Sequence, residues 1–149
     1  PLDLNALVRQ VLALYENSTV PITKHLGEPL PAVWADGAQI RQVIHNLLQN
    51  ALDALAGRDS PRIDIRTRQL DGAVQLTIDD KGPGFAEQLA KRVFEPYVTS
   101  KPKGTGLGLA IVHRVVMDHG GSVEVDSQPG RTRFTVSLPI THAAAATGA

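Results

Sequence analysis

Two asparagines on one predicted helix are the first residues of this sequence whose spacing suggests chemistry. In VIHNLLQNALDAL (43–55) the apolar residues recur at helical spacing, while Asn46 and Asn50 lie one turn apart on a single face. Asparagine is a mediocre helix former, and a solvated helix face normally carries charged side chains instead. An amide oxygen is a hard, neutral ligand that suits Mg²⁺ beside phosphate groups. Taken alone, the pair is more simply explained by a polar helix face or a local hydrogen-bond network.

A second candidate is the turn DDKGPGF (79–85), which directly follows a predicted strand. Asp80 stands where the alternation of the strand ends, and Gly82 and Gly84 follow it around a proline. Glycines let a backbone approach a ligand closely. A carboxylate at the bottom of such a pocket can accept a hydrogen bond from an exocyclic amine such as that of adenine. An ordinary turn accounts for the same residues when they are taken singly.

A third candidate is KPKGTGLGLAIV (101–112), in which alternate glycines lead into a predicted helix. The first amides of a helix are free donors at the positive end of its dipole, and this arrangement binds phosphate. The pattern is not G-x-G-x-x-G, because Leu109 stands where the last glycine is required, and it is not a P-loop. The residues expected to meet phosphate are Lys101, Lys103, Gly104, Gly106 and Gly108.

The helices and strands that must position these segments follow from periodicity and turn signals. Asp36 is expected to cap the long helix and Gly57 to end it. Asp71-Gly72 and Gln128-Pro129-Gly130 each join two alternating segments, which predicts two hairpins. The expected helices are 4–15, 37–56 and 107–119, and the expected strands are 20–26, 32–36, 62–70, 73–80, 122–127 and 131–139. This pattern indicates an α+β fold: a two-layer α/β sandwich whose mixed, mainly antiparallel sheet is covered on one face by helices.

Length and composition limit the class of protein. A chain of 149 residues is long enough for one domain with a substantial core. Fifteen basic and fifteen acidic residues cancel, so no net charge attracts nucleic acid or a membrane surface. The sequence has no cysteine and no apolar run long enough to span a bilayer. We expect a cytoplasmic domain over 1–140 that contacts neither nucleic acid nor membrane, with a disordered tail at 141–149, as part of a longer protein.

The order of these motifs resembles that of the GHKL ATPase superfamily, and in particular the catalytic, ATP-binding domain of sensor histidine kinases. VIHNLLQNALDAL is similar to the Asn box of that family, DDKGPGF to its first glycine box and GTGLGL to its second. FEPYVTSK (94–101) resembles the Phe box and the ATP lid, and PGRTRFTVSLP (129–139) resembles the closing strand. The resemblance covers residues 1–140 and implies the Bergerat fold with ATP and Mg²⁺ as ligands.

The resemblance also implies roles for individual residues. Asn50 would ligate Mg²⁺, and Asn46 would support the phosphates or the metal-bound waters. Asp80 would accept a hydrogen bond from the adenine amine, with Thr132 beneath the ring. The other implied nucleotide contacts are Gly82, Gly84, Tyr97, Thr99, Lys101, Lys103, Gly104, Thr105, Gly106, Leu107 and Gly108. Lys101 or Lys103 would pair with the terminal phosphate, so both lysines join the two asparagines in the implied catalytic set.

The same resemblance implies transfer of the γ-phosphate of ATP to a histidine that this chain does not supply. Relatives that hydrolyse ATP carry Glu at the position of Asn46, and an amide cannot act as the base that activates water. The phosphorylated histidine of the family is typically followed by Glu or Asp, whereas the five histidines here precede Leu, Asn, Arg, Gly and Ala. We therefore expect the acceptor on a separate dimerisation domain of the parent protein, with a response regulator as the indirect partner.

Two other functions are compatible with these motifs. A GHKL protein-serine kinase of the anti-sigma type would share the glycine boxes, and so would a non-catalytic module whose bound nucleotide gates a partner. The opening segment PLDLNALVRQVL and the Phe box favour the histidine kinase, and the intact glycine boxes with Asn50 argue against a decayed site. The sequence leaves open whether the parent protein is a membrane-bound sensor.

Overall fold

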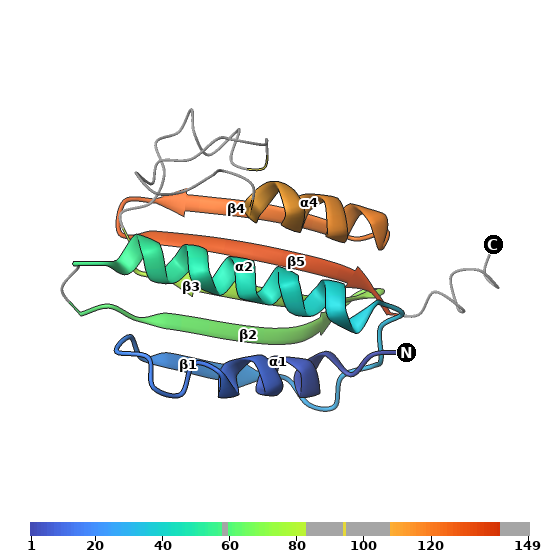
Figure 1. Cartoon of the computed structure of the whole chain (residues 1–149). Coiled ribbons are helices and arrows are strands. Elements are labelled where there is room, and N and C mark those ends of the chain that lie inside the picture. The colour runs from blue at the N-terminus through green and yellow to red at the C-terminus, as the bar shows by residue number, and fades with distance from the viewer. Residues whose placement is uncertain (58–59, 83–93, 95–107, 141–149) are drawn as a thin grey trace.

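The protein is a two-layer α/β sandwich, in which helices cover one face of a five-stranded sheet (Figure 1). The computed structural model describes residues 1–57, 60–82, 94 and 108–140. In chain order the elements are α1 (Leu4–Ala13), β1 (Ile22–Leu26), α2 (Gly37–Leu55), β2 (Ile63–Leu70), β3 (Ala73–Asp80), α4 (Gly108–Asp118), β4 (Ser122–Gln128) and β5 (Arg131–Pro139). The α+β fold class predicted from the sequence is confirmed.

The sheet has the strand order β1-β2-β3-β5-β4. β1 pairs with β2 in parallel, and the other three pairs are antiparallel. Asp71, with φ of 54°, and Gly130, with φ of 85°, occupy the two hairpin turns. Both hairpins were predicted from these turn residues, which tolerate the left-handed backbone region better than most.

Helix α2 runs along the middle of the sheet (Figure 1) and has the caps that the sequence predicts. The Asp36 carboxylate accepts hydrogen bonds from the amides of Ala38 and Gln39, at 2.9 and 3.1 Å. The helix ends at Leu55, and Gly57 has a φ of +75°. The sheet-facing side of the helix is almost completely buried at Ile40, Val43, Ile44, Leu47, Leu48, Ala51 and Leu55. This apolar stripe fixes which side of α2 faces away from the sheet.

Three predictions differ from the structure by two residues or more. Residues 32–36 form no strand: Val33 makes one isolated bridge with Leu2, with backbone hydrogen bonds of 2.6 and 3.0 Å in the two directions. Three residues after Val33 the chain reaches Asp36, the N-cap of α2, so the segment turns into the helix before a longer strand can form. The first helix ends at Ala13 instead of residue 15, and β1 begins at Ile22 instead of residue 20. The predicted tail at 141–149 lies outside the described residues.

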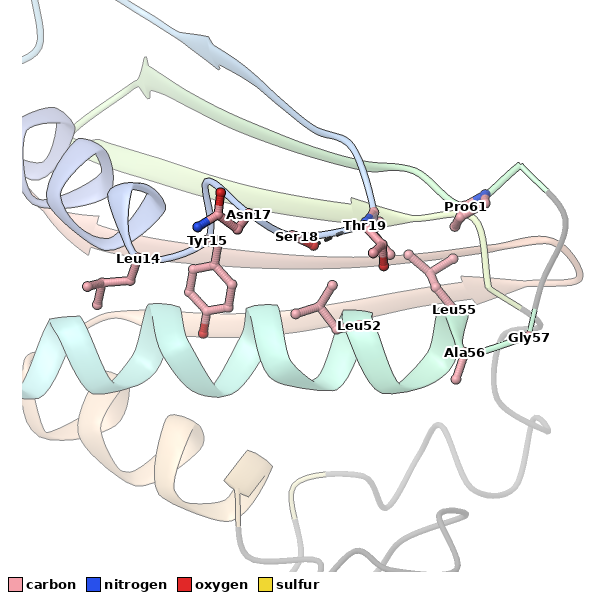
Figure 2. A pocket seen from close by; sticks show the side chains of 11 residues that line it. Leu14, Tyr15, Asn17, Ser18, Thr19, Leu52, Leu55, Ala56, Gly57 and Pro61 are labelled. Carbon is pink, nitrogen blue, oxygen red and sulfur yellow. Dashed lines mark hydrogen bonds between the residues drawn. The ribbon is translucent and has the colours of Figure 1, made fainter.

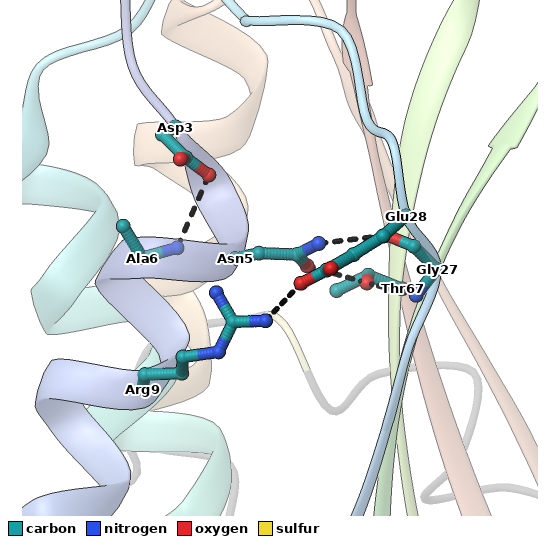
Figure 3. A network of polar contacts seen from close by, with 7 residues as sticks. All are labelled: Asp3, Asn5, Ala6, Arg9, Gly27, Glu28 and Thr67. Atoms are coloured by element: carbon teal, nitrogen blue, oxygen red, sulfur yellow. Dashed lines mark hydrogen bonds and ion pairs between the residues drawn. The ribbon is translucent and has the colours of Figure 1, made fainter.

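A buried polar network attaches α1 to the sheet (Figure 3). Asn5 is 3% exposed; its Nδ2 donates to the carbonyl of Gly27 at 2.7 Å, and its Oδ1 accepts from the Thr67 hydroxyl at 2.6 Å. A Cβ at Gly27 would lie 2.8 Å from the carbonyl oxygen of Thr67, so only glycine permits this approach. Arg9 of the same helix pairs with Glu28 at the surface. The network is internally satisfied and therefore holds α1 in place.

None of the helices in the described part of the chain has both the length and the apolarity that crossing a bilayer requires. Helix α2 is the longest at 19 residues, but polar side chains occupy its outer side. Its role is to cover the sheet and to present those polar side chains to neighbouring elements.

Candidate functional site

Asn46 and Asn50 are covered by neighbouring elements, whereas other polar residues of α2 such as Gln49 and Asp53 are exposed to solvent. Asn46 is partly buried, and its Nδ2 donates to the carbonyl of Gly108, the first residue of α4, at 3.3 Å. Asn50 lies one turn further along and is 5% exposed. The sequence places Asn50 on the ligand-facing side of α2, and the structure shows that this amide is buried. A buried amide needs hydrogen-bond partners, which makes Asn50 a candidate for ligand contact.

Gly82 brings the chain that follows β3 against α2. A Cβ at Gly82 would lie 3.2 Å from the carbonyl oxygen of Ala54 and 2.7 Å from Oδ1 of Asp80. Only a hydrogen atom fits between these groups, so the glycine is required by packing. Ala54 lies one turn beyond Asn50, which puts the contact on the polar side of α2. The sequence analysis missed Ala54, although its small size and its spacing from the asparagines were visible signals.

Asp80 and Thr132 are register partners in neighbouring strands β3 and β5. They are 2% and 3% exposed. The carboxylate of Asp80 accepts a hydrogen bond from the amide of Gly82 at 2.8 Å. The hydroxyl of Thr132 lies 3.3 Å from that of Ser127 on β4. The structure thus brings together two polar residues that the sequence analysis assigned to the same base.

The first residue of α4 closes the other end of this region. Gly108 is exposed, and a Cβ built on it would meet nothing within 4 Å among the described residues. Packing therefore does not require glycine here, in contrast to Gly82. The start of α4, which is the positive end of its helix dipole, lies beside Asn46. A missing side chain at such an end leaves room for an anionic ligand to approach the backbone.

These contacts define a region at one end of the sandwich, beside the polar side of α2, which we call the α2 edge. It runs from the start of α4 along the polar side of α2 to the end of β3 and its neighbour in β5. Its described members are Asn46, Asn50, Ala54, Asp80, Gly82, Gly108 and Thr132. The other predicted site residues lie outside the described residues: Gly84, Tyr97, Thr99, Lys101, Lys103, Gly104, Thr105, Gly106 and Leu107.

Phe94 is the described residue of the predicted Phe box. Its ring stacks on that of His113 of α4 with centroids 5.5 Å apart, and it meets Phe134 of β5 edge-on at 6.1 Å. Aromatic pairs at these separations add to the energy gained from burial. Phe94 therefore packs against the two elements that flank the α2 edge.

The opposite, helix-free face of the sheet carries ion pairs that the sequence analysis missed. Nε of Arg133 donates to Asp79 at 2.7 Å, and this hydrogen bond raises the pKa of Arg133 above its ordinary value. Asp64, the register partner of Asp79, accepts hydrogen bonds from Arg62 and lies 3.4 Å from His25. Burial, the largest single influence, raises the pKa of Asp64, but its bonds to Arg62 and His25 and their charges lower it overall. These pairs are structural.

A groove of about 630 Å³ lies between the end of α1 and the end of α2 (Figure 2). Its described lining contains no charged side chain and includes Leu14, Thr19, Leu52 and Pro61. Tyr15 lines it too, and its hydroxyl contacts Nδ1 of His45 at 2.7 Å. The groove lies on the side of α2 toward α1, away from Asn46 and Asn50. Its described lining offers polar side chains such as Asn17 and Ser18 but no charged group to meet phosphates, and it contains no residue of the α2 edge.

Comparison with known proteins identifies the family. A family model described as "Histidine kinase-, DNA gyrase B-, and HSP90-like ATPase" matches residues 35–142. The chain belongs to this ATPase family. The matched range includes α2, β3, α4 and β5, and thus every described residue of the α2 edge.

Within the ATPase family, the similar proteins are sensor histidine kinases. The sensory histidine kinase/phosphatase NtrB of Rhodobacter capsulatus is 39% identical over 122 residues, which cover 74% of this chain and 34% of that protein. The catalytic domain of histidine kinase ThkA is 30% identical with a TM-score of 0.84, and 94% of each chain is covered. A complex of ThkA with the response regulator TrrA gives a TM-score of 0.79 at 28% identity, over 94% of this chain and 41% of that one. The chain is a histidine kinase catalytic domain of this ATPase family, and it spans about a third of the length of NtrB.

Proposed function

We propose that this domain binds ATP with Mg²⁺ at the α2 edge and transfers the γ-phosphate to a histidine on a separate domain of its parent protein. The single observation that carries the proposal is the convergence at this edge of Asp80, Asn50 and the start of α4. Asp80 offers an acceptor for the adenine base, Asn50 offers a ligand for Mg²⁺, and the start of α4 offers backbone donors for the phosphates. The family supports nucleotide binding, and the described contacts support its location.

Asp80 is the candidate for base recognition. Its carboxylate is buried, and Gly82 holds one oxygen through an amide hydrogen bond of 2.8 Å. An ionised carboxylate has further acceptor sites, which can take an N–H of the adenine amine. Guanine presents a carbonyl at that position, and two acceptors facing each other in a buried site repel. Thr132, beside Asp80 in the ladder, would lie under the ring.

The donor set at the α2 edge fits Mg²⁺ that arrives with ATP. The described residues contain no group of three or more His, Cys, Asp or Glu side chains that could cage a metal ion. Mg²⁺ bound with nucleotides usually keeps several waters and takes one or two protein ligands beside the phosphates. One amide oxygen from Asn50 meets that requirement. When bound, the ion would offset the negative charge of the phosphates.

The residues of the chain would position the reactants and stabilise charge. Asn46 fixes the start of α4 beside the phosphates through its bond to the carbonyl of Gly108. Lys101 or Lys103 would bind the terminal phosphate. The acceptor imidazole attacks with the lone pair of its unprotonated nitrogen: the new P–N bond forms as the bond from phosphorus to the β–γ bridging oxygen breaks, and ADP leaves. Because that lone pair is already available, the domain needs no strong base, and Asn46 supplies none.

The acceptor histidine is expected on another domain, since the described histidines are engaged inside this one. Each has a partner in the fold: His25 contacts Asp64, His45 contacts Tyr15, His113 stacks on Phe94, and His119 bonds Val115 and Asp36. A phosphorylated ring in any of these places would lose its contact. We infer that the partner is a dimerisation domain of the same parent protein, with a response regulator as the eventual recipient.

A transfer assay with γ-labelled ATP tests the proposed function. Alone, the domain should acquire almost no covalent label and should hydrolyse ATP slowly. Addition of the acceptor domain of the parent protein as a separate chain should restore labelling, weakly, because the tether that raises the effective concentration is missing. The label should be lost in acid and stable in base, as expected for phosphohistidine. Acid-stable label on Ser or Thr would indicate a kinase of the anti-sigma type, and fast hydrolysis without an acceptor would contradict the role of Asn46.

A further inference from the structure

His119, at the C-terminal end of α4, contacts the N-cap of α2. Its Nδ1 lies 2.7 Å from the carbonyl oxygen of Val115 in its own helix. Its Nε2 accepts a hydrogen bond from the backbone amide of Asp36 at 3.1 Å. The two residues that meet are 83 positions apart in the sequence, so the contact joins two separate elements.

The two partners fix the protonation of the ring. A carbonyl oxygen only accepts, so Nδ1 must carry the proton that it donates to Val115. A backbone amide only donates, so Nε2 must offer its lone pair to Asp36. Both bonds exist together only in the neutral imidazole with its proton on Nδ1.

Among the described residues, the His119 contact is one of two hydrogen bonds between the α4 segment and the α2 segment, which also pack together through buried apolar side chains. At the other end of α4, the carbonyl of Gly108 accepts from Asn46 at 3.3 Å. The helices are antiparallel, because the end of α4 meets the start of α2 while the start of α4 meets its middle (Figure 1). The Asn46 bond lies at the start of α4 and the His119 bond just past its end, so together with the apolar packing they set the position of α4 along the axis of α2.

The sheet also holds the His119 end of α4. Gly120 ends the helix with a φ of +73°, and a Cβ at Gly121 would overlap the carbonyl oxygen of Ser137 on β5. The chain therefore passes directly from His119 onto the sheet. A displacement of α4 from α2 would have to occur at its start, where Gly108 lies beside the proposed phosphates.

We propose that His119 is a positioning residue for nucleotide binding: by bridging α4 to the N-cap of α2, it sets where the start of α4 lies relative to Asn46 and Asn50. The inference rests on the proposed function, because it assigns the bound nucleotide to the α2 edge. His119 itself is at the far end of α4 and acts through the position of Gly108.

Two isosteric variants separate the inter-helix bond from the bond within α4. The side-chain oxygen of Gln can occupy the place of Nε2, so His119→Gln keeps an acceptor for the Asp36 amide. The side-chain amide of Asn occupies the place of Nδ1, so His119→Asn keeps a donor for Val115 but loses Asp36. Calorimetry with Mg²⁺ and the non-hydrolysable ATP analogue AMP-PNP should give about 3- to 10-fold weaker binding for His119→Asn, the size of one net hydrogen bond, and less than about 2-fold for His119→Gln.

Arg133→Ala serves as the stability control, because it removes an ion pair on the opposite face of the sheet and should leave AMP-PNP affinity unchanged. If His119→Gln and His119→Asn have equal melting temperatures but only His119→Gln keeps wild-type affinity for AMP-PNP, general destabilisation cannot explain the difference. Equal affinity of wild type and both variants would overturn the inference alone. Failure of the wild type to bind Mg²⁺ and AMP-PNP would overturn the proposed function, and the inference with it.

The contact can be tested without nucleotide. In the ¹⁵N spectrum of the wild-type domain at neutral pH, the His119 ring should show a protonated Nδ1 and an unprotonated Nε2. The Asp36 amide should be protected from hydrogen exchange, and this protection should be lost in His119→Asn and kept in His119→Gln. A wild-type ring protonated on Nε2 would contradict the proposal, whether or not the Asn variant folds.

Discussion

Asp79 and Asp80 are adjacent in β3, carry the same charge and are both buried, at 9% and 2% exposure, yet they lie on opposite faces of the sheet. Asp79 points to the helix-free face, where its register partner Arg133 donates to it at 2.7 Å. Asp80 points to the helix-covered face, where its register partner is Thr132 and where the amide of Gly82 donates to it. Successive side chains of a strand point in opposite directions, so one step along the chain separates the two environments.

The difference shows how one strand can stabilise the fold and serve a site. A carboxylate matched by a guanidinium is neutralised, and its bonds lie within the protein. Among the described residues, the carboxylate of Asp80 lies beside a threonine hydroxyl and accepts a hydrogen bond from a backbone amide. The second arrangement suits recognition of a neutral donor such as an aromatic amine. The same separation is found on α2, where Leu48 faces the core and Asn50 the α2 edge.

Removing the charge of each aspartate in turn should have very different effects on the two faces of the sheet. Asp80→Asn would turn a donor toward the adenine amine, and we expect nucleotide affinity to fall at least about 1,000-fold, because sites built on a buried polar contact discriminate strongly. Asp79→Asn should leave nucleotide affinity within about 2-fold of wild type. Calorimetry with Mg·ADP measures both. Similar losses in the two variants would show that the two faces do not differ in function.

Helix α2 offers the same contrast between a core residue and a site residue. Leu48→Ala removes a completely buried side chain and should cost about 3 kcal/mol of unfolding free energy, with nucleotide affinity retained in the folded protein. Asn50→Ala should cost less unfolding free energy, because Asn50 lies on the ligand-facing side of α2 and not in the apolar core. The same substitution should abolish Mg²⁺-dependent phosphotransfer. Denaturant titration and the transfer assay distinguish them. If Asn50→Ala unfolds the protein while transfer survives in the folded fraction, Asn50 belongs to a structural network.

A smaller effect is expected from the ion pair on the helix-free face. Arg133→Ala leaves the buried carboxylate of Asp79 without its guanidinium, which should cost about 1 kcal/mol of unfolding free energy. The Arg133 side chain is 41% exposed, so water screens the pair and keeps the loss modest. Arg133→Lys should recover part of it. A change in nucleotide affinity of either variant would mean that the two faces are coupled.

The smallest effect concerns acid stability through Asp64. Its pKa is lowered overall, although burial opposes the bonds from Arg62 and His25. A folded-state pKa below the unfolded value gives stability that is present above the ordinary pKa of 3.8 and is lost as the pH falls through the lower folded value. Asp64→Asn should therefore show a flatter loss of melting temperature below pH 4 than wild type. Parallel pH profiles of the two proteins would show that the pKa of Asp64 does not differ between the folded and unfolded states.

Local signals were enough to predict most of the fold. The turn residues Asp71-Gly72 and Gly130 set two hairpins, and Asp36 and Gly57 bound α2, because each depends on the conformational preference of one or two residues. Residues 32–36 were wrongly predicted as a strand, because an apolar run does not reveal whether a partner strand is available. The single bridge from Val33 to Leu2 depends on how α1 docks.

The site was only partly predictable for the same reason. The asparagine spacing and the position of Asp80 at a strand end identified the polar residues of the α2 edge, and the pairing of Asp80 with Thr132 agrees with their joint assignment. The contact of Gly82 with Ala54 and the bond from Asp36 to His119 link residues far apart in the sequence. Nothing in the residue types alone states which helix will lie against which.

Base selectivity of the wild-type domain is the most direct test of the role of Asp80, because it needs no substitution that could disturb the fold. Calorimetry should compare Mg·ATP with Mg·GTP and Mg·ITP, which share the phosphates and the metal but present a carbonyl where adenine has its amine. We predict clear binding of Mg·ATP and binding of both other nucleotides that is weaker by about 100-fold or more, since Asp80 would face an acceptor. Equal affinity for all three would contradict the assignment of Asp80 to the base.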